Sequence, residues 1–354
     1  MTTAQQSRFW LAAFAGFLLL VWLFSPVLLP FVAGLAIAYL LDPSVDRLEL
    51  WGLPRWAATA AALLMFMLAI FLAALLLVPL IQAQVAHLLD VLPGYAARAR
   101  EAITPLVENL VARLSPDDVA RLRGAVGQHV GDVAGWIGGV VRGVLSSGVA
   151  LFDVLSVLFI TPIVAFYLLR DWDRLVAAVD SWLPRRHLDT VRAQCREIDA
   201  TLAGFLRGQA AVCMALGGFY AVALSLAGLD FALVIGLLSG ILSFIPYVGS
   251  LFGLAASVGL AALQFDELWR VGLVAGIFIV GQAAEGNFLT PKLVGDRVGL
   301  HPVWVMFSLL AGGALFGFLG VLLAVPVAAS LGVVVRFLLR QYLASPLYRG
   351  TLPP

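Results

Sequence analysis

The stretch that decides the fold runs from residue 231 to 265 and reads FALVIGLLSGILSFIPYVGSLFGLAASVGLAALQF. It contains no charged residue, but Pro246 and Gly249 lie near its centre, where they should break a helix and release backbone hydrogen-bonding groups. At membrane depth such a break is tolerated only beside protein or a water-filled cavity. Asp230 and Asp266 flank the stretch and suit the outer side of a membrane. We therefore expect a hairpin of two helices that enters from outside.

A second uncharged run, residues 298–335, is interrupted around Gly312 and Gly313 and around Gly317 and Gly320. Its flanks, Arg297 and Arg336, suit the inner side. Two oppositely oriented, interrupted hairpins around a central helix are the arrangement with which inverted-repeat transporters build a site at the membrane midplane. Two ordinary pairs of spanning helices are the alternative, and the charge pattern fits both.

The whole chain is too apolar for a soluble domain, with 62% hydrophobic and 12% charged residues among 354. This composition predicts an all-α, polytopic integral membrane protein embedded in the lipid bilayer. A crossing needs about 20 apolar residues, so the longest uncharged runs must fold back, giving about eight membrane segments, two of them broken or re-entrant helical hairpins. The first apolar run is too long for a cleavable signal peptide. A net charge of +1 argues against a nucleic-acid partner.

Arginine positions orient the chain in the membrane. Seven arginines lie between Arg170 and Arg207, a segment without a predicted span, and the positive-inside rule places this segment in the cytoplasm. Counting crossings from there places both termini and a loop expected from Asp42 to Arg55 in the cytoplasm, and the long polar region, residues 83–148, outside. The patterning of that region predicts a small extramembrane helical domain. Its glycines recur every fourth residue from Gly127 to Gly143, which favours close helix packing within one subunit or between subunits.

These features divide the chain into six parts. They are N-terminal membrane helices (1–82), the extramembrane helical domain (83–148), a membrane helix (149–170), an Arg-rich cytoplasmic helical loop (171–207), a transport core with the broken hairpins (208–340) and a C-terminal tail (341–354).

The helix predicted between the two broken runs, residues 271–289, carries Glu285 and Gln282 one turn apart on one face. Its small residues Gly272, Gly276, Gly281 and Gly286 give it a thin face, which suggests tight packing around a polar pocket. A carboxylate at the mouth of a membrane helix is costly and is usually kept for binding, pairing or proton transfer. For Glu285 we weigh solute binding or proton exchange against a structural ion pair with Lys292, Arg297 or an arginine of the cytoplasmic loop. For Gln209 we expect a hydrogen bond between two helices rather than contact with a ligand.

We expect Pro246, Tyr247 and Gly249 to shape the tip of one half-helix and Gly317 and Gly320 that of the other. Polar contacts would come from the helix between them. The predicted solute or ion pathway therefore comprises Glu285, Gln282, Asn287, Pro246, Tyr247, Gly249, Gly317, Gly320 and Gln209.

Catalytic signatures are missing from the sequence. The four histidines form no His-Glu-x-x-His, there is no Gly-x-Ser-x-Gly, and Lys292, the sole lysine, lies in no phosphate-binding loop. We therefore expect no enzyme activity, no cofactor and no metal site.

Four motifs carry a resemblance to a known family. They are TPIVAFYLLRD (161–171), GFLRGQ (204–209), FIPYVG (244–249) and EGNFLTPK (285–292), the last continuing to LHP (300–302). On these motifs the sequence resembles the autoinducer-2 exporter, or AI-2E, family of bacterial permease-like membrane proteins. The motif positions taken as structural are Pro162, Arg207, Pro291, Lys292, His301 and Pro302.

The resemblance implies a homo-oligomer, with a pentamer expected, in the bacterial inner membrane. It implies ion-coupled or facilitated movement of a small solute, and we expect an elevator-like mechanism coupled to protons or sodium. Some members look like exporters of the quorum-sensing signal autoinducer-2, and others resemble sodium/proton antiporters. A non-transporting scaffold or regulator that recruits partners through the Arg-rich loop is a further alternative.

Overall fold

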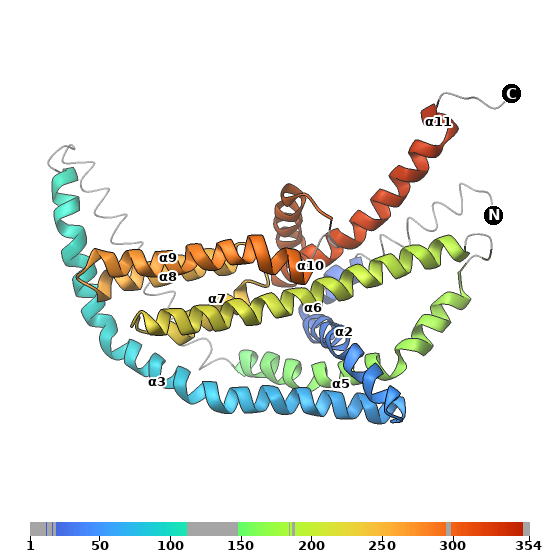
Figure 1. Cartoon of the computed structure of the whole chain (residues 1–354), viewed down its shortest axis with the longest axis horizontal. Helices are drawn as coiled ribbons and strands as arrows, with labels where there is room; N and C mark the ends of the chain where they lie inside the picture. The colour runs from blue at the N-terminus through green and yellow to red at the C-terminus, as the bar shows by residue number, and fades with distance from the viewer. Residues whose placement is uncertain are drawn as a thin grey trace.

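The computed structural model describes Ala12, Gly16 and residues 19–111, 148–183, 185, 188–294 and 299–349. Within these residues the secondary structure is helical and no strand occurs, which confirms the expected all-α class (Figure 1). The glycine series from Gly127 to Gly143 and Arg297 lie outside the described residues.

The first described helices form a tight corner. A 3₁₀ turn, η1 (Ser25–Val27), leads into α2 (Leu29–Leu50), and the long, curved α3 (Arg55–Val111) follows (Figure 1). Arg55 bridges the corner, with nitrogen–oxygen distances of 3.1 Å to Asp42, 2.9 Å to Asp46 and 2.9 Å to Glu49. Because α2 continues past residue 41, the loop expected after it shortens to a few residues. Helix α3 likewise continues through the boundary expected at residue 82.

Helices α5 (Gly148–Ser181) and α6 (Leu188–Leu226) meet at the Arg-rich segment, which is therefore largely helical. Arg192 donates to both carboxylate oxygens of Asp180, at 2.7 and 2.6 Å, and joins the two helices there. Pro162 lies inside α5. Beside it Thr161 donates to the carbonyl of Pro30 at 3.3 Å, so this motif packs α5 against α2.

Helices α6, α7 (Ala232–Leu242), α8 (Val248–Gln264) and α9 (Leu268–Ala284) run side by side along the longest axis of the molecule (Figure 1). Glycines allow α6 and α7 to touch through their backbones: a Cβ on Gly236 or Gly240 would collide with backbone atoms of α6. The buried core of this unit includes Val212, Leu216 and Phe278.

The α7–α8 hairpin returns to the end of the molecule at which it begins. One side chain holds both of its outer ends: Gln264 accepts from the backbone of Asp230 and donates to the carbonyl of Gly228, each at 2.9 Å. Helix α7 has 11 residues, so it is about 17 Å long and does not span a hydrocarbon core of about 30 Å. The dimensions are those of a broken, re-entrant hairpin.

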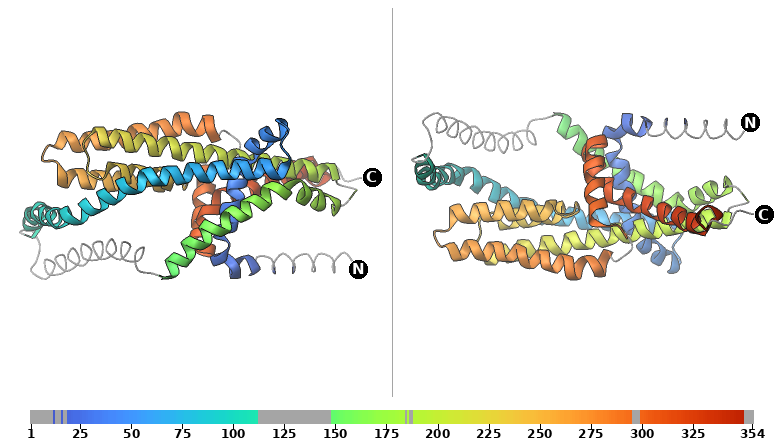
Figure 2. Two further views of the ribbon diagram at one scale, coloured as in Figure 1. Left: turned by 90° about the horizontal axis from the view of Figure 1, so that it is seen from below. Right: turned by 90° about the horizontal axis from the view of Figure 1, so that it is seen from above.

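The last long helix, α10 (Pro302–Ala344), is broken at Gly317, whose φ of 60° and ψ of −139° are not helical. Figure 2 shows that its two halves run in different directions. The halves meet closely, because a Cβ on Gly312 would lie 2.5 Å from the carbonyl oxygen of Gly320. A short helix, α11 (Pro346–Arg349), ends the described chain.

Five helices are long and apolar enough to cross a membrane, judged over the described residues, and α7 and α8 are shorter apolar helices. Little of the span of α3, Arg55–Gln84, is buried, and the apolar side chains of Leu68, Phe71 and Leu75 are exposed on it. This is a multi-pass membrane protein with a large apolar surface suited to lipid or to another subunit.

Candidate functional site

Glu285 marks a change of helix type. Helix α9 ends at Ala284, and the chain continues as a π-helix, η3 (Glu285–Val294). The sequence predicted one helix to residue 289 and gave no sign of this switch. A π-helix is rare and often lies at a functional site, because its wider turn redirects backbone groups and side chains. Pro291 lies inside it and brings no backbone donor.

The half-buried Glu285 side chain is partnered by Gln282, which donates from Nε2 to Oε2 at 3.3 Å. Within the described residues no ion pair to Glu285 is found, and Lys292 is exposed farther along the π-helix. Asn287 is also exposed, and it donates to the carbonyl of Ala283 on its own helix at 2.9 Å. The structure therefore brings together two of the three polar residues expected here.

A residue of α6 that the sequence did not single out lies close to this polar spot. The ring of Tyr220 approaches α9 at Gly281, one turn before Glu285. Tyr220 is fully buried, and its ring stacks on Phe278 with centroids 4.3 Å apart and 18° between the planes. Its hydroxyl oxygen has no hydrogen-bond partner in the described part of the protein.

Gly281 fixes the position of this tyrosine. A Cβ there would lie 2.5 Å from the Tyr220 hydroxyl oxygen, so only a glycine lets the ring approach α9 one turn before Glu285. A Cβ added to Gly272, Gly276 or Gly286 would meet only open space. The thin face expected on this helix therefore packs within the subunit at Gly281 alone among these four glycines.

The break between α7 and α8 lies where the sequence placed it. Tyr247 caps α8 with a left-handed φ of 68°, and Pro246 lies in the turn before it. Gly249 packs directly against Ser239 and Ser243 at the end of α7.

Gln209 supports this break from α6. It donates from Nε2 to the carbonyl of Ser243 at 2.6 Å, so a carbonyl left over at the end of α7 is bonded between helices. At the neighbouring Gly208, a Cβ would collide with the backbone of Leu293 in the π-helix. One turn of α6 thus holds both the α7–α8 break and the end of the π-helix in place.

The break in α10 is separate from these contacts. Gly317 is exposed, and a Cβ on it would meet nothing within 4 Å, while Gly320 packs against Gly312 of the same helix. His301 accepts from the backbone of Val303 at 3.3 Å and caps α10, and Pro302 occupies its first turn. These motif residues therefore start the helix.

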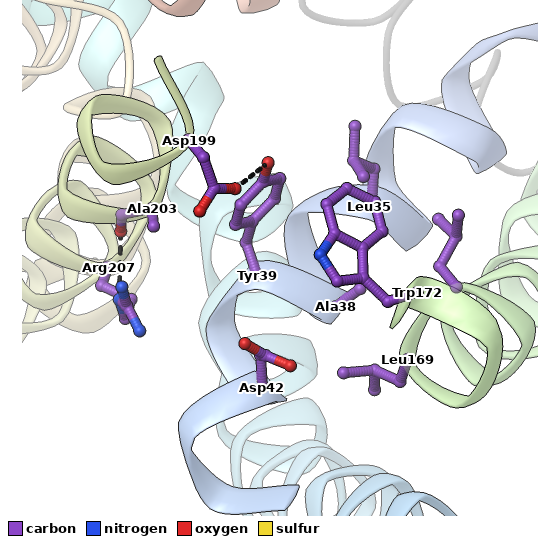
Figure 3. Close-up of a pocket in the computed structure, with 10 residues that line it drawn as sticks. Leu35, Ala38, Tyr39, Asp42, Leu169, Trp172, Asp199, Ala203 and Arg207 are labelled. Atoms are coloured by element: carbon purple, nitrogen blue, oxygen red, sulfur yellow. Dashed lines mark hydrogen bonds between the residues drawn. The ribbon is translucent and has the colours of Figure 1, made fainter. Parts of the chain in front are cut away.

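A small cavity of about 90 Å³ lies between α2, α5 and α6 (Figure 3). Tyr39 donates to Asp199 at 2.8 Å across it, and the ring of Trp172 meets that of Tyr39 edge-on at 5.8 Å. Asp42 and Arg207 complete the polar lining. Only Arg207 was named from the sequence, as a motif residue. The other lining residues could have been found from Tyr39 and Trp172, because aromatic residues at the ends of apolar helical segments often lie at the depth of the lipid headgroups.

These features define the class of the protein. Long apolar helices, a broken hairpin and a polar spot beside a helix that changes type are the architecture of multi-pass transport proteins. The chain belongs to the AI-2E transporter family: the sequence model described as AI-2E family transporter matches residues 11–340.

Relatives from two bacteria match this chain over most of their length. YrrI of Bacillus subtilis, provisionally named a transport protein, is 29% identical over 315 residues, which cover 89% of this chain and 87% of YrrI. PerM of Escherichia coli, provisionally named a permease, is 28% identical over 320 residues, covering 90% and 89%. The AI-2 transport protein TqsA of Escherichia coli is 28% identical over 323 residues, covering 90% and 86%. These names describe transporters and permeases rather than enzymes.

Proposed function

We propose that this protein exports a small polar solute, similar to autoinducer-2, from the bacterial cytoplasm across the inner membrane. The observation that carries the proposal is the buried, unpartnered hydroxyl of Tyr220, which lies against Gly281 one turn before the Glu285–Gln282 pair. The name of TqsA supports the choice of solute. A buried hydroxyl without a partner costs about 1–3 kcal/mol, so a solute oxygen that bonds to it is favoured.

The three groups suit a hydroxylated, uncharged solute. Glu285 accepts hydrogen bonds, Gln282 donates and accepts, and Tyr220 supplies a hydroxyl that does both. The adjoining core of α6 and α9 is apolar, which favours a neutral solute over a charged one, because burying an unpaired charge is costly.

Coupling to protons or sodium would pass through Glu285. Its carboxylate lacks an ion-pair partner among the described residues, which leaves it able to exchange a proton or bind a cation. The same observation favours a second candidate function, sodium/proton antiport. In an elevator-like mechanism, the breaks at Tyr247 and Gly317 would serve as the flexible points.

A scaffold function through the Arg-rich loop has less support. Arg170 and Arg192 of that segment already pair with Asp171 and Asp180 of the same chain. We further propose that both termini face the cytoplasm and that the subunits form a homo-oligomer, with a pentamer expected. The exposed span of α3 and the open glycine face of α9 are surfaces on which neighbouring subunits would pack.

The test is transport by the purified protein in proteoliposomes that contain a pH-sensitive dye. Wild type, Glu285→Gln and Tyr220→Phe would be compared under imposed proton and sodium gradients, with autoinducer-2 present or absent. Glu267→Gln is the matched control, because Glu267 is a partly exposed carboxylate paired with Arg270 at the start of α9.

Export requires autoinducer-2 efflux that both site variants reduce and the control does not. Cation-driven proton movement without solute, lost in Glu285→Gln, would replace export with antiport. Unchanged efflux and unchanged pH dependence in Glu285→Gln would eliminate the site proposed for both functions.

A further inference from the structure

The polar cavity between α2, α5 and α6 lies next to an apolar groove. The groove has a volume of about 360 Å³ and lies between α2, α6 and the second half of α10, with Val32, Leu202 and Leu331 among its lining residues. Leu35 and Tyr39 line both spaces, so the cavity and the groove adjoin, and the pair has a polar end and an apolar end. Such a shape fits an amphiphile rather than a compact solute.

The polar end presents both signs of charge. Asp42 and Asp199 contribute carboxylates, and each has one oxygen engaged, by Arg55 and by Tyr39 respectively. Figure 3 shows Asp199 and Arg207 of α6 on one side of Tyr39, Trp172 of α5 on the other, and Asp42 farther along α2. Arg207 bonds the carbonyl of Ala203 through Nε, and no ion pair to its guanidinium is found within the described residues.

This pattern complements a zwitterionic headgroup. A primary ammonium would lie between the two carboxylates and over an aromatic ring, where cation–π attraction adds to the ion pairs. The adjoining phosphate would bind the guanidinium of Arg207, which suits phosphate oxygens. Trp172 and Tyr39 lie at the ends of apolar helical segments, the depth at which aromatic side chains meet lipid headgroups.

We propose that these adjoining spaces bind one membrane phospholipid with a protonated amine headgroup, such as phosphatidylethanolamine, with the headgroup in the cavity and an acyl chain in the groove. The lipid would bridge α2 and α5 to α6 and α10, two parts of the protein that meet at Tyr39 and Asp199. The site is distinct from Glu285 and does not depend on which solute is carried.

Native mass spectrometry of the delipidated, full-length protein tests the proposal. Phosphatidylethanolamine, phosphatidylglycerol and phosphatidylcholine with identical acyl chains would be titrated separately, and bound lipids counted per subunit. We expect one phosphatidylethanolamine per subunit, bound at least about tenfold more tightly than the other two. Phosphatidylglycerol brings no cation to the carboxylates, and the trimethylated amine of phosphatidylcholine donates no hydrogen bond.

Variants separate the two ends of the site. Asp199→Asn should remove most of the preference for the amine, because it keeps an oxygen for Tyr39 but loses the charge. Leu202→Trp should fill the groove and reduce binding of all three lipids. Asp189→Asn, in the exposed first turn of α6, is the matched control and should bind as wild type does.

Equal binding of all three lipids, or a preference that survives Asp199→Asn, would overturn the proposal. So would an intersubunit crosslink between Leu331→Cys and Leu202→Cys formed in the purified oligomer, because it would show that a second copy of the chain occupies the groove.

Discussion

Replacing Tyr220 with phenylalanine should stabilise the protein and impair its function at once. The hydroxyl is fully buried and unpartnered in the described structure, while the ring fills the space between Phe278 and Gly281. Tyr220→Phe keeps the ring and removes the buried polar atom, which costs about 1–3 kcal/mol when unsatisfied. We therefore expect the free energy of unfolding to rise by about 1 kcal/mol or more.

Solute binding, in contrast to stability, should be weakened by the same substitution. If its oxygen bonds to the hydroxyl, the variant loses a neutral hydrogen bond worth about 0.5–1.5 kcal/mol, which weakens apparent solute affinity about 2- to 13-fold. The melting temperature in detergent, measured with and without solute, reports the first effect, and the concentration dependence of transport in proteoliposomes reports the second.

Tyr348→Phe in α11 controls for the loss of a phenolic hydroxyl, because Tyr348 is exposed. A variant that is less stable than wild type would show that the hydroxyl is satisfied in the folded protein. Unchanged stability with unchanged solute affinity would refute the reasoning as a whole.

Three other outcomes follow from local geometry. Gly240→Ala places a Cβ against the backbone of α6 and should lower stability by about 1–3 kcal/mol, whereas Gly259→Ala, which meets open space, should leave the melting temperature unchanged. Gly317→Ala must adopt a φ of 60°, so about 1–3 kcal/mol of strain should lower the melting temperature and slow transport more than it changes solute affinity. Hydrogen bonds from Arg192 hold the pKa of Asp180 below its usual range. The stability that this carboxylate contributes is therefore complete above its unfolded pKa of about 4, and it is lost as the pH falls through the lower pKa of the folded state. Proteolysis at the α5–α6 turn should therefore increase between pH 6 and about 3 in wild type, and Asp180→Asn should be cleaved readily at both values.

The sequence predicts those parts of the fold that depend on local chemistry. Pro246 and Gly249 interrupt an apolar run, so the break between α7 and α8 could be placed to within a few residues. The break in α10 follows in the same way from Gly317, the position at which the backbone leaves helical geometry. The all-helical, membrane-spanning class follows from composition alone.

The features that were not predicted depend on contacts between distant residues. Tyr39 and Asp199 are 160 positions apart, and their hydrogen bond arises only when α2 packs beside α6. Tyr220 joins the candidate site because Gly281 admits its ring, which no pattern within either helix indicates. Helix α3 passes residue 82 without interruption, since the onset of polar residues changes its surroundings but not its helical preference.

Gln264 gives the α7–α8 hairpin the mechanics of a lever. Because one side chain ties the entrance of the hairpin to its exit, the two arms are held in register where they enter and leave. At the far end of the hairpin Gln209 holds the carbonyl of Ser243, so any rotation of the hairpin about this tie must break that hydrogen bond. Helix α8 has 17 residues and is about 26 Å long, so a rotation of about 10° would move its tip at Tyr247 by about 4–5 Å. A small tilt at one glutamine would thus become a movement nearly as large as the distance of about 5.4 Å between neighbouring turns of a helix.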